Sequence, residues 1–224
     1  MLHYNYSLSS LIIFIHIFTR SFINKKEIIT ITQDLSDTIL GISKIILFYN
    51  TISNNIYIET NLNNFDKLIL NSIPNQEISN VLTYNNIDYI MSSMVLLYDK
   101  DYEYLYHDII TISCISLCQF YNYHNIVLIC LTLFTISSPL LAFAKLLRHN
   151  NFHKLSEYTF ILFGITFFIY RILFFTLVLK VSIFNEYYNT PQYYIINITE
   201  LLIYKMQLNW MYKIYKTITN HYKK

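Results

Sequence analysis

Charged residues, glycine and proline are all scarce in this sequence. Only 13% of its 224 residues are charged, against ~25% in a typical soluble domain. There are 2 glycines and 3 prolines, whereas 54% of the residues are hydrophobic, including 22 tyrosines and 16 phenylalanines. Long apolar stretches with few helix breakers and few charges are typical of membrane-spanning helices. The composition therefore predicts an all-α membrane protein and argues against a soluble domain.

The low net charge and the few cysteines argue against a nucleic-acid interface and a metal site. The formal net charge is only +2, without the clustered basic face that nucleic acid requires, so no nucleic-acid partner is expected. The three cysteines, Cys114, Cys118 and Cys130, fall within apolar segments, where a buried thiol behaves as a small apolar residue. No spacing of cysteine and histidine fits a zinc site. We therefore expect no metal and no bound cofactor.

Seven segments have the length of a membrane-spanning helix, which needs ~20 mostly apolar residues. They are residues 8–23, 28–49, 78–98, 104–120, 126–147, 158–181 and 194–215. The second segment contains Asp34, Asp37 and Lys44, so we expect these side chains to face the interior of a helix bundle. The polar stretch at 50–76 is predicted to be a loop with one short amphipathic turn at 65–73.

Basic residues lie mainly on one side of this seven-span arrangement. One face of the membrane receives Lys25, Lys26, Lys100, Arg148, Lys154, Lys213, Lys216, Lys223 and Lys224. The other face receives Lys67 and Lys180. Because positively charged loops stay in the cytoplasm, we predict a lumenal N-terminus and a cytoplasmic C-terminus. The terminal lysine pair favours residence in the endoplasmic reticulum or another endomembrane.

Arg171 lies near the middle of the sixth predicted span. A charge at that depth costs ~2.5–3.5 kcal/mol on insertion scales, so such a residue normally faces the protein interior and is paired. We expect Arg171 to pair with a carboxylate, and the candidates are Asp88, Asp108 and Glu200.

Polar residues also mark two faces of the last span. Lys205 and Asn209 lie four residues apart on one face, and Glu200 and Gln207 lie on another. Part of this polarity can serve to hold neighbouring helices together through hydrogen bonds. In the fifth span, Pro139 is expected to kink the helix.

Ser137 and Ser138 precede that proline. Their hydroxyl groups are expected to help satisfy the backbone carbonyls that Pro139 leaves without a donor. Kinked helices often border a cavity, although a kink alone does not make a site.

His107 and Asp108 stand side by side at the start of the fourth span. Neighbouring side chains on a helix point about 100° apart. We therefore expect one of them to face a cavity and the other to meet a neighbouring helix, without forming a tight pair. A histidine can act as a base or nucleophile near neutral pH. Alternatively, both residues lie among the lipid headgroups and cap the helix.

Five short motifs follow one another along these spans. They are Tyr84-Asn-Asn-Ile-Asp88, His107-Asp108, Ser137-Ser-Pro139, Phe167-Phe-Ile-Tyr-Arg171 and Gln207-Leu-Asn-Trp210. In this order they resemble the TLC domain, the family of ceramide synthases, translocation-associated membrane proteins and small lipid-regulating membrane proteins. Thr83 stands where the family usually has glycine, and Thr135 where an acidic residue is common.

The resemblance implies a fold and a division of the chain. Six helices would form a TLC-type barrel around a lipid-sized central cavity, with a seventh helix outside it. Residues 1–25 would be the outside helix, 26–217 the TLC domain and 218–224 a basic cytoplasmic tail. The polar residues expected around the cavity are Tyr84, Asp88, Ser137, Ser138, Pro139, Arg171, Glu200, Lys205, Gln207, Asn209 and Trp210.

Departures from the family pattern bear on the function. Family members that make ceramide carry paired histidines and an acidic motif, whereas here Asp108 replaces the second histidine and residues 133–138 read Leu-Phe-Thr-Ile-Ser-Ser. The resemblance is therefore closer to the non-synthase members, which implies a lipid-handling protein for sensing, trafficking or lipid composition, with membrane lipids as partners.

Two alternatives stay open. One is an acyl-CoA-dependent N-acyltransferase in which His107 and Asp108 are catalytic and acyl-CoA is a substrate. The other is a transporter or channel, although the chain lacks the repeated halves and broken helices that secondary transporters tend to show.

Overall fold

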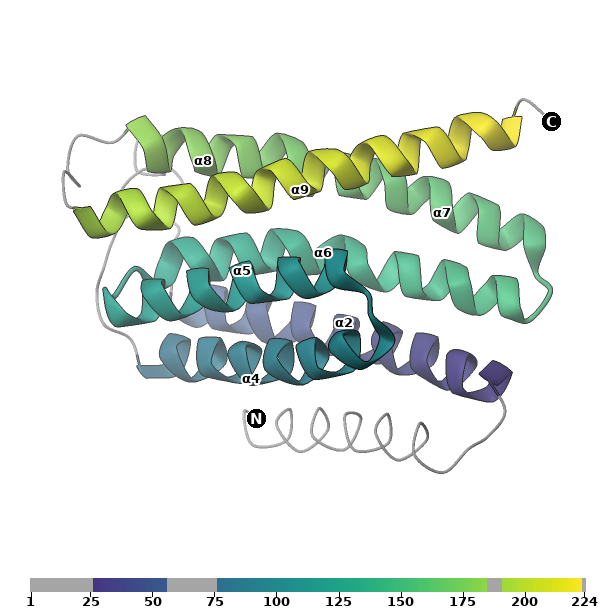
Figure 1. Ribbon diagram of the computed structural model, residues 1–224, viewed down its shortest axis with the longest axis horizontal. Helices are drawn as coiled ribbons and strands as arrows, with labels where there is room; N and C mark the ends of the chain where they lie inside the picture. Colours follow the sequence, from purple (N-terminus) through teal and green to yellow (C-terminus); the bar gives the residue numbers. More distant parts are fainter. Residues whose placement is uncertain (1–25, 56–75, 185–190, 223–224) are drawn as a thin grey trace.

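The computed structural model describes residues 26–55, 76–184 and 191–222, which form helices joined by short turns (Figure 1). The helices are α2 (Lys26–Asn55), α4 (Gln76–Asp99), α5 (Tyr102–Phe120), α6 (His124–His149), α7 (His153–Phe167), η2 (Phe168–Phe174), α8 (Phe175–Phe184) and α9 (Pro191–Tyr222). The π-helical segment η2 joins α7 to α8, so these three form one continuous rod. The described part of the chain thus contains six rods, and the prediction of an all-α protein is confirmed.

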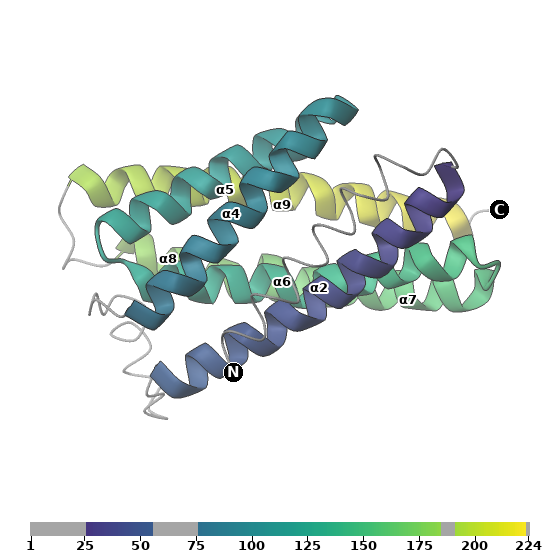
Figure 2. The same cartoon turned by 90° about the horizontal axis from the view of Figure 1, so that it is seen from below.

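Successive rods run in opposite directions, with α2 and α4 on one side of the other four (Figures 1 and 2). The α7–α8 rod packs on α6 and α9, α9 packs on α5, and α5 packs on α4, while α2 packs mainly on α6. We call the end with the α4–α5 and α6–α7 turns the mouth end (right in Figure 1), and the opposite end the packed end.

Three tight turns share one backbone design. Lys100, Asn122 and Asn151 each adopt a positive φ, of 59°, 63° and 63°, within two residues of the end of a helix. In each turn the following residue donates its N–H to the carbonyl five residues back, as Phe152 does to Leu147 at 3.0 Å. This is the Schellman motif, which usually has glycine at the left-handed position. With so little glycine in the chain, asparagine takes that position twice, because it tolerates a left-handed backbone better than most residues.

The predicted spans from the second to the seventh coincide with the six rods, which extend a few residues further at most ends. The predicted loop at 50–76 begins later, because α2 continues to Asn55. The first predicted span (8–23) and the amphipathic turn at 65–73 lie outside the described residues. Among the described helices, two are long and apolar enough to cross a membrane: His124–His149, with mean hydropathy 2.3, and His153–Phe184, with 2.2.

Apolar side chains fill the packed end. Phe48, Leu82, Ile115, Leu128 and Ile196 come from five different helices and are fully buried there. A core of this kind, built from interlocking aliphatic and aromatic groups, is dense and resists deformation. It holds the six rods at fixed spacing, while the bundle is hollow towards the mouth end.

The closest approach of α2 to α6 depends on Gly41 and Pro139. A Cβ atom at Gly41 would lie only 2.6 Å from Cγ of the Pro139 ring. Helix α6 continues as one helix through this proline, whose ring is buried against α2. Glycine is therefore required at position 41 because any side chain would force the two helices apart.

We predict that Gly41→Ala destabilises the protein while Gly164→Ala does not. At Gly41 the added methyl group meets a rigid ring, and such overpacking costs about 1–3 kcal/mol. At Gly164 it would lie 3.2 Å from the flexible ends of Ile214 and Ile218, and alanine gains about 1 kcal/mol in helix propensity. Unfolding of both variants in detergent micelles measures the difference. A Gly41→Ala protein as stable as the wild type would contradict the proposed contact.

Candidate functional site

A cavity of about 840 Å³ occupies the bundle towards the mouth end. Its walls come from α2, α4, α5, α6, α7, η2 and α9. Apolar side chains such as Leu40, Met91, Phe163 and Ile214 make up much of the lining, and charged groups are interspersed among them. The volume lies within the ~300–1,000 Å³ range of small-molecule sites, and a mainly apolar wall with a few polar groups is the usual character of such sites.

The mouth of this cavity is charged. Asp37, Asp101, Lys145 and Lys213 line it and are exposed at the mouth end. Lys213 on α9 donates to Glu103 at the start of α5, with a 2.7 Å distance to Oε1. The pair ties α5 to α9 at the rim, so the opening is bordered by a fixed contact as well as by solvated charges.

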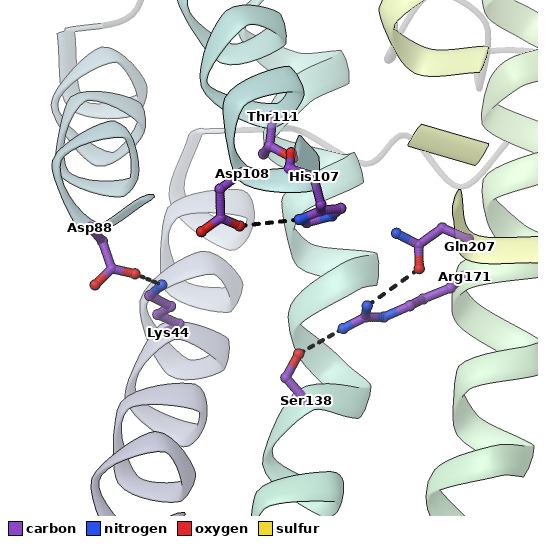
Figure 3. A network of polar contacts seen from close by, with 8 residues as sticks. All are labelled: Lys44, Asp88, His107, Asp108, Thr111, Ser138, Arg171 and Gln207. Carbon is purple, nitrogen blue, oxygen red and sulfur yellow. Dashed lines mark hydrogen bonds and ion pairs between the residues drawn. The ribbon is translucent and has the colours of Figure 1, made fainter. Parts of the chain in front are cut away.

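Arg171 lies deep in the same cavity. The residue is 8% exposed, and its guanidinium donates to the Phe134 carbonyl, to the Ser138 hydroxyl at 2.6 Å and to Oε1 of Gln207 at 3.4 Å. Figure 3 shows the contacts with Ser138 and Gln207. The ring of Phe167 stacks on the guanidinium at 4.9 Å. Arg171 thereby connects η2 with α6 and α9 at the level where the cavity ends.

The π-helical segment explains how Arg171 faces inward. Buried residues recur every four positions along this rod, at Phe163, Phe167, Arg171, Phe175 and Leu179. In an α-helix each four-residue step turns the side chain about 40° past the previous one, since a turn holds 3.6 residues. The wider turn of η2 takes up this excess, so the series stays on one face. π-Helical turns are rare and frequently occur at functional sites.

His107 and Asp108 both line the cavity and are both buried. Nδ1 of His107 lies 3.2 Å from Oδ1 of Asp108 (Figure 3), so the expectation that these neighbours would not pair was wrong. Their Cα–Cβ bonds diverge on the helix, but rotation of the side chains brings the carboxylate to the ring. The His107 ring also packs on Trp210, with 4.9 Å between ring centroids.

Trp210 on α9 contacts two residues of α5, Tyr104 and Glu103. Its indole stacks on Tyr104 with centroids 5.2 Å apart, and its Nε1 donates to Oε1 of Glu103 at 2.8 Å. An indole with a satisfied N–H and two aromatic neighbours has little freedom to move. It therefore forms a rigid part of the cavity wall beside His107.

Lys44 and Asp88 form an ion pair across the cavity wall, from α2 to α4 (Figure 3). Their side chains are 13% and 15% exposed. The pair is the main polar link between two helices that otherwise have few contacts. Asp34, also lining the cavity, lies 3.3 Å from Nε2 of His149 on α6.

A family model for the TLC domain matches residues 82–216, more than half of the chain. The chain belongs to the TLC domain family. No curated protein matches the sequence. Membership in the TLC family, together with the two apolar helices, points to a membrane protein with a lipid-related function.

The five TLC-like motifs meet at the cavity. Each contributes at least one lining residue: Asp88, His107, Ser138, Arg171 and Trp210. These residues come from five different elements and are as far as 122 positions apart in the chain, taking Asp88 and Trp210 as the extremes. Gln207 of the last motif does not line the cavity but is fully buried behind it and bonds to Arg171.

Other residues expected at the TLC cavity lie elsewhere. Lys205 and Asn209 are exposed on the outer side of α9, because Glu200, Ile203 and Gln207 occupy its inner face. Glu200 is buried nearer the packed end, beside Ser182. Ser137, Pro139 and Tyr84 do not line the cavity either: the first two are buried in helix packing and Tyr84 is half-buried on α4.

The partners expected for Arg171 are also different. Among the described residues it makes no ion pair with a carboxylate, because Asp88 pairs with Lys44, Asp108 contacts His107 and Glu200 lies towards the packed end. Ser138 does donate to a carbonyl, that of Phe134 at 3.2 Å. This carbonyl also accepts from Arg171, so the hydroxyl supports the arginine site rather than the carbonyl freed by Pro139.

Sequence reasoning did not single out several residues of this TLC cavity. Glu103 carried no signal in the sequence, and the pairing of Lys44 with Asp88 was not predicted. Phe134 takes part through its backbone carbonyl, which carries no side-chain signal. For Gly41, the presence of a glycine in a chain with so few was the one available signal.

The Lys44–Asp88 pair generates a stability prediction. Asp88→Leu leaves the Lys44 charge buried without its partner, which costs about 3–5 kcal/mol. The double variant Lys44→Met/Asp88→Leu removes both charges and should recover most of that loss. Chemical unfolding in micelles measures both, with Lys180→Met, an exposed lysine on α8, as the control. A double variant as unstable as Asp88→Leu would show that the pair does not act as a unit.

Proposed function

We propose that this protein is an integral membrane lipid-handling protein that holds a lipid in its TLC cavity and thereby takes part in lipid sensing, trafficking or control of lipid composition. The observation that supports this most is the meeting of all five motifs at one cavity of about 840 Å³. Apolar walls suit a hydrocarbon chain, and the few buried polar groups can orient a headgroup.

The shape of the lining also supports a lipid. A second hollow of about 450 Å³, between α6, α7 and α9, shares the lining residues Leu141, Lys145, Phe160 and Thr217 with the cavity. Together they offer a long, mainly apolar space beside the two most hydrophobic helices. A lipid chain fits such a space better than a compact polar metabolite.

We further propose that the six rods form the TLC-type barrel and that residues 8–23 add a seventh span outside it. Lys100, Arg148, Lys154, Lys213 and Lys216 gather at the mouth end, whereas Lys180 lies towards the packed end. This asymmetry supports a cytoplasmic mouth and C-terminus and a lumenal N-terminus. Residence in the endoplasmic reticulum or another endomembrane is part of the same proposal.

A cavity-filling substitution tests the proposal. Thr135 lines the cavity and is half-buried, so Thr135→Phe places a ring in the space proposed for the lipid. We expect several-fold less co-purified lipid on this variant than on the wild type, measured by native mass spectrometry after extraction in mild detergent. The matched control is Ser113→Phe, on the exposed face of α5. Equal lipid on Thr135→Phe and wild type would overturn the proposal.

One observation favours a second function, an acyl-CoA-dependent N-acyltransferase. Asp108 contacts Nδ1 of His107, while Nε2 has no hydrogen-bond partner among the described residues. A carboxylate on one ring nitrogen holds the proton there and leaves the other nitrogen as a base or nucleophile. His107 would attack the thioester of acyl-CoA, coenzyme A would leave as the thiol, and the acyl group would pass to an amine that gives up its proton.

Acyl transfer by the purified protein decides between the two functions. If it is an enzyme, labelled acyl-CoA and a sphingoid base should give an amide. His107→Gln should abolish the product, and Asp108→Asn should lower the rate at least about tenfold by removing the group that orients the ring. Ser113→Ala, on the exposed face of α5, should not change it. No amide above background would leave lipid handling without catalysis.

A further inference from the structure

Arg171 is a buried cation without a counter-charge in the cavity proposed for the lipid. Its three partners, the Phe134 carbonyl, the Ser138 hydroxyl and the Gln207 amide oxygen, are all neutral. We propose that Arg171 binds the anionic group of the lipid, a carboxylate or a phosphate monoester, so that the preferred ligand is an anionic amphiphile. This inference rests on the proposed function and narrows it to one chemical class.

The other charged groups buried around the cavity contact a partner of opposite charge or a histidine, whereas Asp37, Asp101 and Lys145 are exposed at the mouth. Lys44 pairs with Asp88, and Lys213 pairs with Glu103. Asp108 faces His107, and Asp34 faces His149. The cation buried deepest is thus the one whose charge the described residues do not neutralise. An isolated charge in a membrane interior is costly, and a ligand of opposite charge would remove that cost.

Some N–H donors of the Arg171 guanidinium are not used in hydrogen bonds within the described residues. Nη1 donates one hydrogen bond and Nη2 donates two, and Nε has no hydrogen-bond partner among the described residues. An arginine carries five N–H donors, so these contacts leave one donor on Nη1 and the one on Nε without an acceptor in the described part of the chain. A hydrogen bond from a guanidinium to a charged oxygen is stronger than one to a neutral oxygen. The rings of Phe134 and Phe167, 5.8 Å and 4.9 Å away, stabilise the cation only partly and do not use its in-plane donors.

The carboxylate of Asp108, which also lines the cavity, contacts His107 and not Arg171. In Figure 3 the Asp108 carboxylate points to the His107 ring, which lies between it and the Arg171–Gln207 pair. The anion would therefore approach Arg171 from the side lined by Ser138 and Phe167.

The surroundings require that the anion be attached to a hydrocarbon chain. Along the α7–η2 rod, Phe160 and Phe163 lie between the mouth end and Arg171, and along α9 Ile214 lies between the mouth end and Gln207. All three line the cavity. A small hydrated anion gains nothing from these walls, whereas an amphiphile buries its chain against them while its charged group reaches Arg171.

The fluorescence of Trp210 can report ligand binding, since it is the only tryptophan in the sequence and lines the cavity. The full chain in nanodiscs of neutral lipid is titrated at pH 8 with dibromostearic acid and with dibromo-octadecanol, whose bromine atoms quench indole fluorescence at short range. The two probes differ only in the charged group. We expect saturable quenching, with the acid bound at least about tenfold more tightly than the alcohol, as a charge-assisted hydrogen bond implies.

Variants of Arg171 and Lys180 test which residue causes the preference for the acid over the alcohol. Arg171→Gln should bind the acid no better than the alcohol, and Lys180→Gln, which removes an exposed positive charge from the same rod, should keep the wild-type ratio. Because Arg171 also connects three helices, Arg171→Lys provides a variant that keeps the charge and should keep a preference for the acid. Loss of the preference in Lys180→Gln as well would overturn the assignment to Arg171.

The outcomes separate this inference from the proposed function. Equal, saturable quenching by acid and alcohol in the wild type would overturn the anion site and leave a lipid cavity. Quenching by neither probe would overturn both. Displacement of the bound acid by inorganic phosphate or acetate at low millimolar concentration would show a site for free anions and overturn the assignment to an amphiphile.

Discussion

A guanidinium in the middle of a long apolar rod must find its acceptors inside the protein, and the centre of this bundle is arranged around that requirement. Arg171 reaches two other helices, α6 through Phe134 and Ser138 and α9 through Gln207. These contacts fix the spacing of three rods at the inner end of the cavity. They also leave a positive charge facing the space where a ligand would lie.

Two irregular features of the helices, the π-helical turn η2 and Pro139 within α6, lie close to residues that face the cavity. The π-helical turn η2 keeps the whole buried series from Phe163 through Arg171 to Leu179 on one face, whereas a regular α-helix would let it drift by about 160°. Pro139 interrupts the hydrogen-bond pattern of α6 within one residue of Ser138, and its ring packs on Gly41. Both departures occur in the two most hydrophobic rods, and the cavity is lined by Arg171 of η2 and by Ser138, the residue before Pro139.

The bundle combines a rigid half with a hollow half. At the packed end, interlocking apolar side chains form a dense core, and a few side-chain hydrogen bonds, such as Gln119 to Ser79 and Ser182 to Asn197, supplement it. Towards the mouth end, polar links such as Lys44 to Asp88 and Lys213 to Glu103 span the gaps between helices. A dense core at one end allows a cavity at the other, since the helices need not pack along their full length. The TLC motifs contribute their lining residues to the hollow half.

The positions of the helices, their antiparallel order and the family motifs all followed from the amino-acid sequence, because apolar length and helix-breaking turns are local properties. The interior positions of Asp34, Lys44 and Arg171 followed as well, since a membrane tolerates few charges on its lipid side. The rotation of α9, which turns Lys205 and Asn209 outward, did not follow. Nor did the neutral partners of Arg171, the contact of His107 with Asp108, or the π-helical turn. A shift of one residue rotates a helix face by about 100°, so these features depend on how neighbouring helices pack, and only the tertiary structure determines them.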